Sequence, residues 1–329
     1  MGLRAFGRGV AALAVVWPGL ALAGPAVNQF EVKDLSNEAS ELEFQSQNAH
    51  VFGHPRRKAF EAAPGDFEFD TNSLVKQRHA LEMEMTLSHF LRMRVGIEYE
   101  SERLDDPETP ARANDFSQLK FTEVAMEGVL ILVPVKKDGI GFGALVEYQA
   151  PVAEADEAAT LFMGPIVEAK WGAWDFVANL FMVKHLGGGE RTPAGLVGRD
   201  EKWDFSYATH LQYKYSDAWT FSLEGYGTVD RLGSSGTRSD EASLFGDHNQ
   251  HRLGPVVYYT FKADKLRDRP PARSGSRMTP VKAGDDDGPV GKGGDDDEGT
   301  SVRIGTGVLF GLNENTPDYS LKWSVEIEF

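Results

Sequence analysis

The chain has 329 residues, a formal net charge of −16 at pH 7 and no cysteine. Without cysteine, disulfides, thiolate metal sites and cysteine nucleophiles are all excluded. The acidic balance argues against nucleic acid as a partner, because phosphates demand a basic surface.

The N-terminal 23 residues have the features of a secretory signal peptide. Arg4 and Arg8 form a positive start, residues 9–22 are mostly apolar, and Ala21-Leu22-Ala23 is a small-residue cleavage site. The apolar run is too short and too broken for a transmembrane helix, which needs about 20 residues. We therefore predict cleavage after Ala23 and assign residues 24–38 to a periplasmic N-terminal segment.

From residue 80 onward, several segments alternate strongly between apolar and polar residues, as in β-strands with two different faces. The pattern is weaker in 39–52, 117–133, 160–171, 175–186, 218–230 and 250–263. We find no convincing 3.6-residue stripe that would favour helices. Around Phe121–Val124 the alternation slips, which a β-bulge would explain. The pattern predicts about twelve strands, in chain order 39–52, 81–87, 91–100, 117–133, 140–149, 160–171, 175–186, 203–215, 218–230, 250–263, 302–312 and 321–329.

The connections between these strands fall into two classes. Short turns follow the second, fourth, sixth and eighth strands, whereas long polar loops follow the first, third, seventh and ninth. Short turns on one rim and long loops on the other are typical of bacterial outer-membrane barrels. The fold class predicted for residues 39–329 is therefore all-β: a single transmembrane, antiparallel, up-and-down β-barrel in the outer membrane of a Gram-negative bacterium.

One connection, residues 264–300, is long although it falls on the short-turned rim. It contains Asp285-Asp286-Asp287 and Asp295-Asp296-Asp297-Glu298 and few apolar residues. This composition predicts a disordered, acidic periplasmic insert. A calcium site is the alternative, but the spacing matches neither an EF-hand loop nor a glycine-rich repeat.

The last strand ends on Phe329 and has one apolar and one polar face. By resemblance to outer-membrane barrels, such a strand is the segment that the barrel-assembly machinery reads. That machinery and outer-membrane lipid are the expected partners.

Charged side chains on the polar strand faces are expected to face the lumen, since Arg or Lys facing mid-bilayer lipid costs about 2–4 kcal/mol. They could line a polar pore whose acidic excess favours cations or polar solutes. Alternatively, they could form buried ion pairs that close a narrow barrel. The candidate lumen-lining residues are Glu82, Glu84, Arg92, Arg94, Glu98, Glu100, Glu123, Glu127, Glu147, Glu168, Lys214 and Glu326.

The sequence predicts no catalytic residue, cofactor or metal site. His248 and His251 form the densest histidine group but lack an acidic partner, which is weak evidence for a metal. A lipid-modifying enzyme on this barrel would need a serine and a histidine within hydrogen-bond reach near the outer interface. No such pair is evident in the alternation.

With these residues in view, the chain resembles the transporter-like outer-membrane barrels of the "MetA-pathway of phenol degradation" type. The resembling stretches are Gly164-Pro165, residues 307–312, Thr316-Pro317-Asp318 and residues 323–329. The resemblance implies uptake of hydrophobic or aromatic compounds and supplies no substrate-binding residues. We predict a channel or transporter-like protein for passive passage or binding of a small solute. A non-conducting structural or surface-interaction barrel is the alternative.

Overall fold

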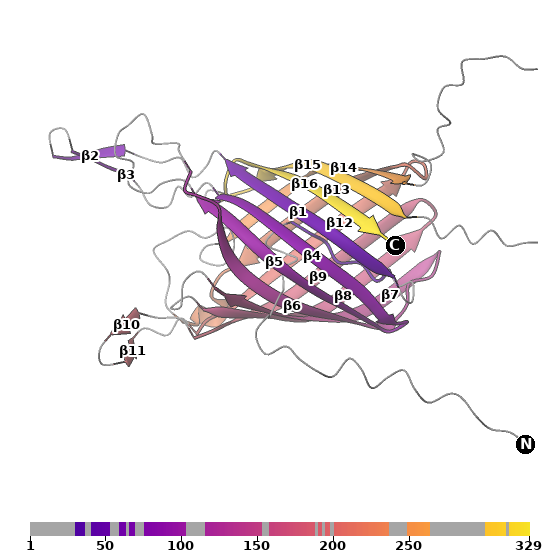
Figure 1. Ribbon diagram of the computed structural model, residues 1–329, viewed down its shortest axis with the longest axis horizontal. Helices are drawn as coiled ribbons and strands as arrows, with labels where there is room; N and C mark the ends of the chain where they lie inside the picture. Colours follow the sequence, from indigo (N-terminus) through magenta and orange to yellow (C-terminus); the bar gives the residue numbers. More distant parts are fainter. Residues whose placement is uncertain are drawn as a thin grey trace, which may run out of the picture.

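Twelve strands form one closed antiparallel barrel in the computed structural model (Figure 1). The structure describes residues 30–36, 41–52, 59–63, 66–69, 76–102, 116–152, 158–187, 190–192, 195–197, 201–236, 249–263, 300–313 and 316–329. Within these ranges, none of the helical structure is long or apolar enough to cross a membrane. The predicted all-β, antiparallel, up-and-down barrel is confirmed; the signal peptide and most of the acidic insert lie outside the described residues.

Each barrel strand pairs with the strands before and after it among the twelve, and β1 pairs with β16 to close the barrel. The strands are β1 (Leu42–Phe52), β4 (Lys76–Ser88), β5 (Leu91–Glu102), β6 (Lys120–Val133), β7 (Gly139–Pro151), β8 (Ala159–Trp171), β9 (Trp174–Leu186), β12 (Trp203–Lys214), β13 (Trp219–Val229), β14 (Gln250–Lys262), β15 (Ser301–Gly311) and β16 (Tyr319–Glu328).

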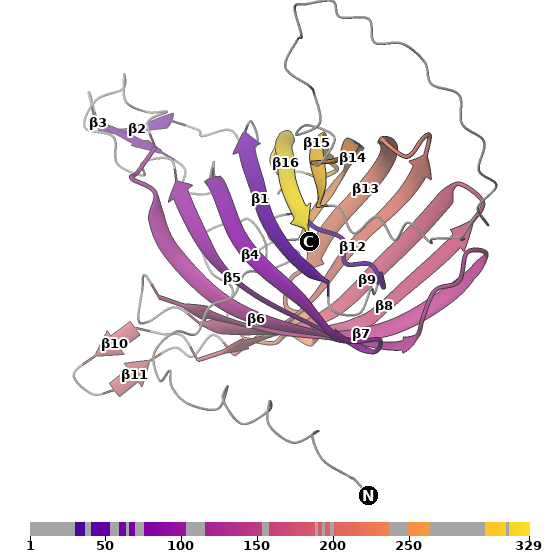
Figure 2. The same ribbon diagram turned by 45° about the vertical axis from the view of Figure 1, so that its right-hand side comes forward.

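The two rims differ as the loop lengths predict. We call the rim with the short turns, where β1 begins and β16 ends, the turn rim, and the opposite one the loop rim. Two small hairpins lie at the loop rim (Figure 2). One pairs β2 (Ala59–Ala63) with β3 (Asp66–Phe69), and the other pairs β10 (Glu190–Thr192) with β11 (Gly195–Val197). They occupy two of the connections for which the sequence predicts long polar loops.

Alternation along each strand separates an outward apolar face from an inward polar one. On β7, Ile140, Phe142 and Val146 are exposed on the outside, whereas Glu147 and Gln149 are buried inside. The predicted bulge is confirmed on β6: Glu98 pairs with Glu123 and Tyr99 with Phe121, so that Thr122 is the extra residue.

Gly164-Pro165 interrupts the ladder between β8 and β9. Proline has no N–H to donate, and the described pairs skip from Met163–Met182 to Ile166–Asn179. A Cβ on Gly164 would lie 1.9 Å from the carbonyl oxygen of Leu180, so only glycine allows the two backbones to approach this closely.

The substitution Gly164→Ala is therefore expected to lower the free energy of unfolding by about 1–3 kcal/mol, the usual cost of overpacking. Urea unfolding in lipid vesicles measures the change. The matched control is Gly128→Ala on β6, whose new Cβ would have its nearest neighbour, Met93 Sδ, at 3.9 Å. Equal losses in the two variants would contradict the steric explanation.

Candidate functional site

The lumen is partly filled by residues 30–36, which precede β1. Figure 2 shows this segment in indigo inside the barrel. The expectation that residues 24–38 form a periplasmic segment is therefore wrong for residues 30–36. The reason lies in their backbone contacts: Lys33 N–H donates to Asn179 Oδ1 at 2.7 Å, Asn179 Nδ2 donates back to Lys33 O at 2.7 Å, and Leu35 N–H donates to Glu168 Oε2 at 2.6 Å. In the described part of the chain the segment pairs with no strand, so side chains of the barrel wall provide the hydrogen bonds that its backbone N–H and C=O groups need.

Arg94 on β5 is the centre of the contact between this inner segment and the wall. Its guanidinium bonds Glu31 of the segment at 2.6 and 2.9 Å, Glu82 at 2.7 Å, and Glu84 at 2.8 and 3.0 Å. Only 2% of the Arg94 side chain is exposed. A planar guanidinium with five N–H donors suits this shared carboxylate site, where the ammonium of lysine could not reach all three groups.

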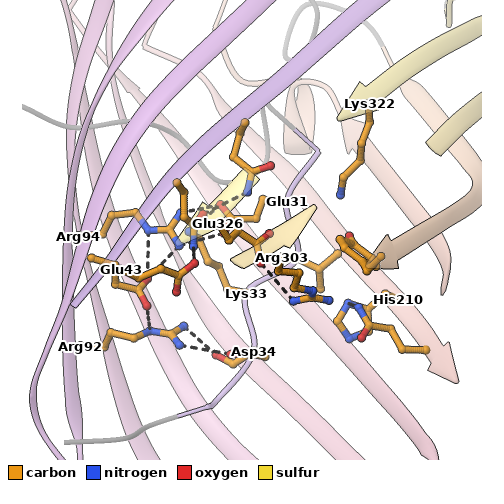
Figure 3. Close-up of a pocket in the computed structure, with 16 residues that line it drawn as sticks. Glu31, Lys33, Asp34, Glu43, Arg92, Arg94, His210, Arg303, Lys322 and Glu326 are labelled. Atoms are coloured by element: carbon orange, nitrogen blue, oxygen red, sulfur yellow. Dashed lines mark hydrogen bonds and ion pairs between the residues drawn. The ribbon is translucent and has the colours of Figure 1, made fainter. Parts of the chain in front are cut away.

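Two more cations connect the segment to the wall. Lys33 Nζ lies 2.7 Å from Glu31 and 3.4 Å from Glu127 on β6. Arg92 donates to the carbonyl oxygens of Asp34 and Ser36 at 2.9 and 3.0 Å, and its guanidinium lies 3.3 Å from the Asp34 carboxylate (Figure 3). Arg92 therefore holds the C-terminal end of the segment, at Asp34 and Ser36.

Apolar packing fixes the segment at both ends. Leu35 is buried in a cluster from β6 to β9 that includes Val129, Leu145, Phe162 and Phe181. Because these side chains fill the lumen on that side, the segment and the β6–β9 wall form one packed core.

At the other end, Phe30 packs on Tyr226, with ring centroids 5.3 Å apart. The carbonyl oxygen of Phe30 accepts a bond from Lys322 Nζ and lies 2.7 Å from Tyr226 Oη, whose single proton is directed to the carboxylate of Glu224. Lys322 and the hydroxyls of Tyr226 and Tyr258 all bond the buried carboxylate of Glu224, at 2.7, 2.5 and 2.6 Å. This fully bonded cluster satisfies a charge that would otherwise be costly to bury.

A polar pocket remains between the segment and the opposite wall. It encloses about 600 Å³ of empty space, part of it open to solvent. Its wall comes from β1, β4, β5, β12, β14, β15 and β16, and Figure 3 shows Lys322, Arg303 and His210 across the pocket from Arg92 and Arg94. Along β1, Gln47 donates to Gln45 at 3.1 Å and Gln45 to Glu43 at 2.7 Å.

Arg303 is the cation most available to a solute in this pocket. Its guanidinium stacks 4.0 Å above the Tyr258 ring, and Nη1 donates to Glu326 at 3.3 Å. About a third of its side chain is exposed, 32%.

The structure distributes the predicted lumen residues over several groups. Glu82, Glu84, Arg92, Arg94, Glu127 and Glu168 contact the inner segment or the cations bound to it, and Glu84, Arg92, Arg94 and Glu326 line the pocket. Glu98 and Glu100 pair with Arg78 in a separate group. Glu147 accepts a bond from Gln149 at 2.8 Å. Glu123 lies opposite Glu98 beside the bulge.

Lys214 departs from the expectation. It is the last residue of β12, at the turn rim, and its side chain is 61% exposed beside Asp217 at 3.0 Å. Alternation predicts the face of a residue, but it could not show that the strand ends at Lys214.

Sequence reasoning also overlooked Glu31, Lys33 and Asp34, which supply the charges of the inner segment. Their alternation with Val32 and Leu35 is a short signal that could have suggested a packed, strand-like segment.

No protein-family model and no curated protein matches the sequence. Among solved structures, the COG4313 outer membrane channel from Pseudomonas putida F1 is 10% identical with a TM-score of 0.52, covering 96% of this chain and 100% of that one. The NanC porin is 8% identical (TM-score 0.43; 87% and 98% covered), and a Pseudomonas aeruginosa FadL homologue is 8% identical (0.39; 93% and 92%). At these identities the first likeness concerns the fold alone, which is that of an outer-membrane β-barrel.

Proposed function

We propose that the protein is an outer-membrane channel for passive passage of a small polar solute, and that the solute moves through the pocket beside the inner segment. The pocket carries this proposal. The segment fills the β6–β9 side of the lumen with packed side chains, whereas a polar pocket that opens to solvent remains on the side of β1, β15 and β16. Selection would rest on the width and charge of this space, without chemistry.

The lining favours a polar or charged solute over an apolar one. The basic residues that line the pocket are Lys33, Arg92, Arg94, Arg303 and Lys322, and the acidic ones are Glu31, Asp34, Glu43, Glu84 and Glu326. An apolar compound would have to displace water from these charges without replacing its hydrogen bonds, which is unfavourable. The hydrophobic or aromatic cargo implied by the family resemblance is therefore less well supported than a polar one.

Planar-bilayer recordings of pocket variants test the proposal. Arg303→Gln makes the pocket more negative and should raise the preference for cations, whereas Glu326→Gln should lower it. The control is Glu98→Gln, because this buried carboxylate lies beside Arg78 and does not line the pocket. Conductance with the same ion preference in both pocket variants would contradict the proposed route.

A closed, non-conducting barrel is the second candidate. The observation that favours it is the continuous contact of the inner segment with the wall through Arg94, Lys33 and Leu35. Absence of any conductance from the folded protein would support this candidate against the channel.

A further inference from the structure

The outward face of β1 is polar where lipid should contact the barrel. Three successive outward positions are Ser46, Asn48 and His50, and the neighbouring strands add Gln77 and His79 on β4 and the Trp323 indole on β16. We call these six residues the outer polar patch. Register brings them together: Asn48 pairs with His79 on one side and with Trp323 on the other, and His50 pairs with Gln77. On β7 the corresponding face is Ile140, Phe142, Ala144, Val146 and Tyr148.

The patch lies within the apolar band of the membrane. Two residues advance about 6.6 Å along a strand, which is about 4.7 Å across the membrane at a tilt of about 45°. Counted from Leu42 at the turn rim, Asn48 lies about 14 Å and His50 about 19 Å into a band about 25 Å tall. Polar groups at this depth have no water to bond, so each needs a protein partner.

Bonds within the patch satisfy only part of it. His79 Nδ1 donates to Asn48 Oδ1 at 2.7 Å, and Asn48 Nδ2 donates to Ser46 Oγ at 3.1 Å. Trp323 Nε1–H donates to His50 Nε2 at 3.3 Å. An amide oxygen can only accept and an indole N–H can only donate, so both histidine tautomers are fixed.

Each neutral imidazole therefore has one nitrogen left over. His50 Nδ1 carries a proton to donate, and His79 Nε2 is an acceptor. Neither nitrogen has a hydrogen-bond partner within the described part of the chain. The two rings lie side by side, with centroids 5.4 Å apart. The two rings thus present one donor nitrogen and one acceptor nitrogen next to each other toward the lipid, beside the side-chain amide of Gln77.

We propose that the outer polar patch is the contact surface between two copies of this chain in the membrane. Under a twofold axis, His50 Nδ1–H of each copy donates to His79 Nε2 of the other, so one patch complements itself. Acyl chains offer neither donor nor acceptor, whereas hydrogen bonds between polar side chains do hold membrane proteins together. A second copy is the partner whose chemistry matches both leftover imidazole nitrogens.

Energy transfer between labelled copies in lipid vesicles tests the proposal. The chain has no cysteine, so His89→Cys in an exposed turn accepts a single dye. Copies with the unsubstituted patch should associate. His50→Phe or His79→Phe should each weaken this association about tenfold or more, because each substitution removes both His50–His79 hydrogen bonds between the copies. An equimolar mixture of the two variants should associate better than either alone, because one His50–His79 pair survives.

Several outcomes would overturn the proposal. These are a monomeric protein at every density, unchanged association in both histidine variants, or a mixture no stronger than its components. Association that requires lipopolysaccharide would assign the patch to a lipid instead. His50→Asn, which keeps a donor, should restore association if His50→Phe acts through that bond. Thr209→Val, on the outward face of β12, should change nothing. Thermal unfolding confirms that each variant is folded.

Discussion

Replacing Arg94 with methionine is expected to lower the free energy of unfolding by about 3–5 kcal/mol, the cost of leaving buried charges without their partner. Arg94 is the shared cation of Glu31, Glu82 and Glu84. Methionine keeps much of the side-chain volume. The decrease in the free energy of unfolding is therefore due to the missing charge and not to a cavity. Urea unfolding in lipid vesicles provides the measurement.

Lys214→Met is the matched control for Arg94→Met. It removes a cation from an exposed ion pair with Asp217 at the turn rim, and such pairs contribute about 1 kcal/mol or less. Adding Glu82→Gln to Arg94→Met should recover part of the loss, because one uncompensated carboxylate becomes neutral. Equal stability of Arg94→Met and the parent protein would show that the inner segment is not held by this cluster.

Replacing residues 30–36 with a glycine-serine segment of the same length is expected to raise single-channel conductance severalfold. The change removes the Glu31, Lys33 and Asp34 charges, together with Leu35, which fills the β6–β9 side. Water and ions would then occupy both sides of the lumen. Planar-bilayer recordings of the parent and variant proteins measure the difference.

Asn179→Ala is the milder companion to that replacement. It removes both bonds to the Lys33 backbone and leaves the segment's charges in place. Conductance should rise less and fluctuate more than in the parent. If the glycine-serine variant conducts no better than the parent, the segment does not limit the passage.

The barrel could be predicted from the sequence because a strand with one lumen-facing and one lipid-facing side alternates polar and apolar residues with a period of two. Leu321, Trp323 and Val325 in β16 show this, and so does the slip at Phe121–Val124, which became the bulge at Thr122. Lys214 shows what alternation cannot predict. The pattern indicates the face of a strand on which a residue lies, but not how far along the barrel axis the residue lies.

The inner segment could not be predicted in the same way. Its partners are far away in sequence: Glu31 pairs with Arg94, 63 positions on, and the Lys33 backbone bonds Asn179, 146 positions on. No local period encodes such contacts. The sequence left open whether inward charges line a passage or close it. In the structure the charges of β4–β6 bind the segment, and three of them, Glu84, Arg92 and Arg94, also line the remaining pocket together with charges of β1, β15 and β16.

Thiol modification during current recording tests the proposed route most directly, because the chain has no native cysteine. Gln45→Cys places a thiol in the pocket wall, and Leu145→Cys places one in the packed core behind the segment. A small charged thiol reagent should block or strongly reduce the current through Gln45→Cys and leave that through Leu145→Cys unchanged. An unaffected current in Gln45→Cys, or a block in Leu145→Cys alone, would contradict passage through the polar pocket.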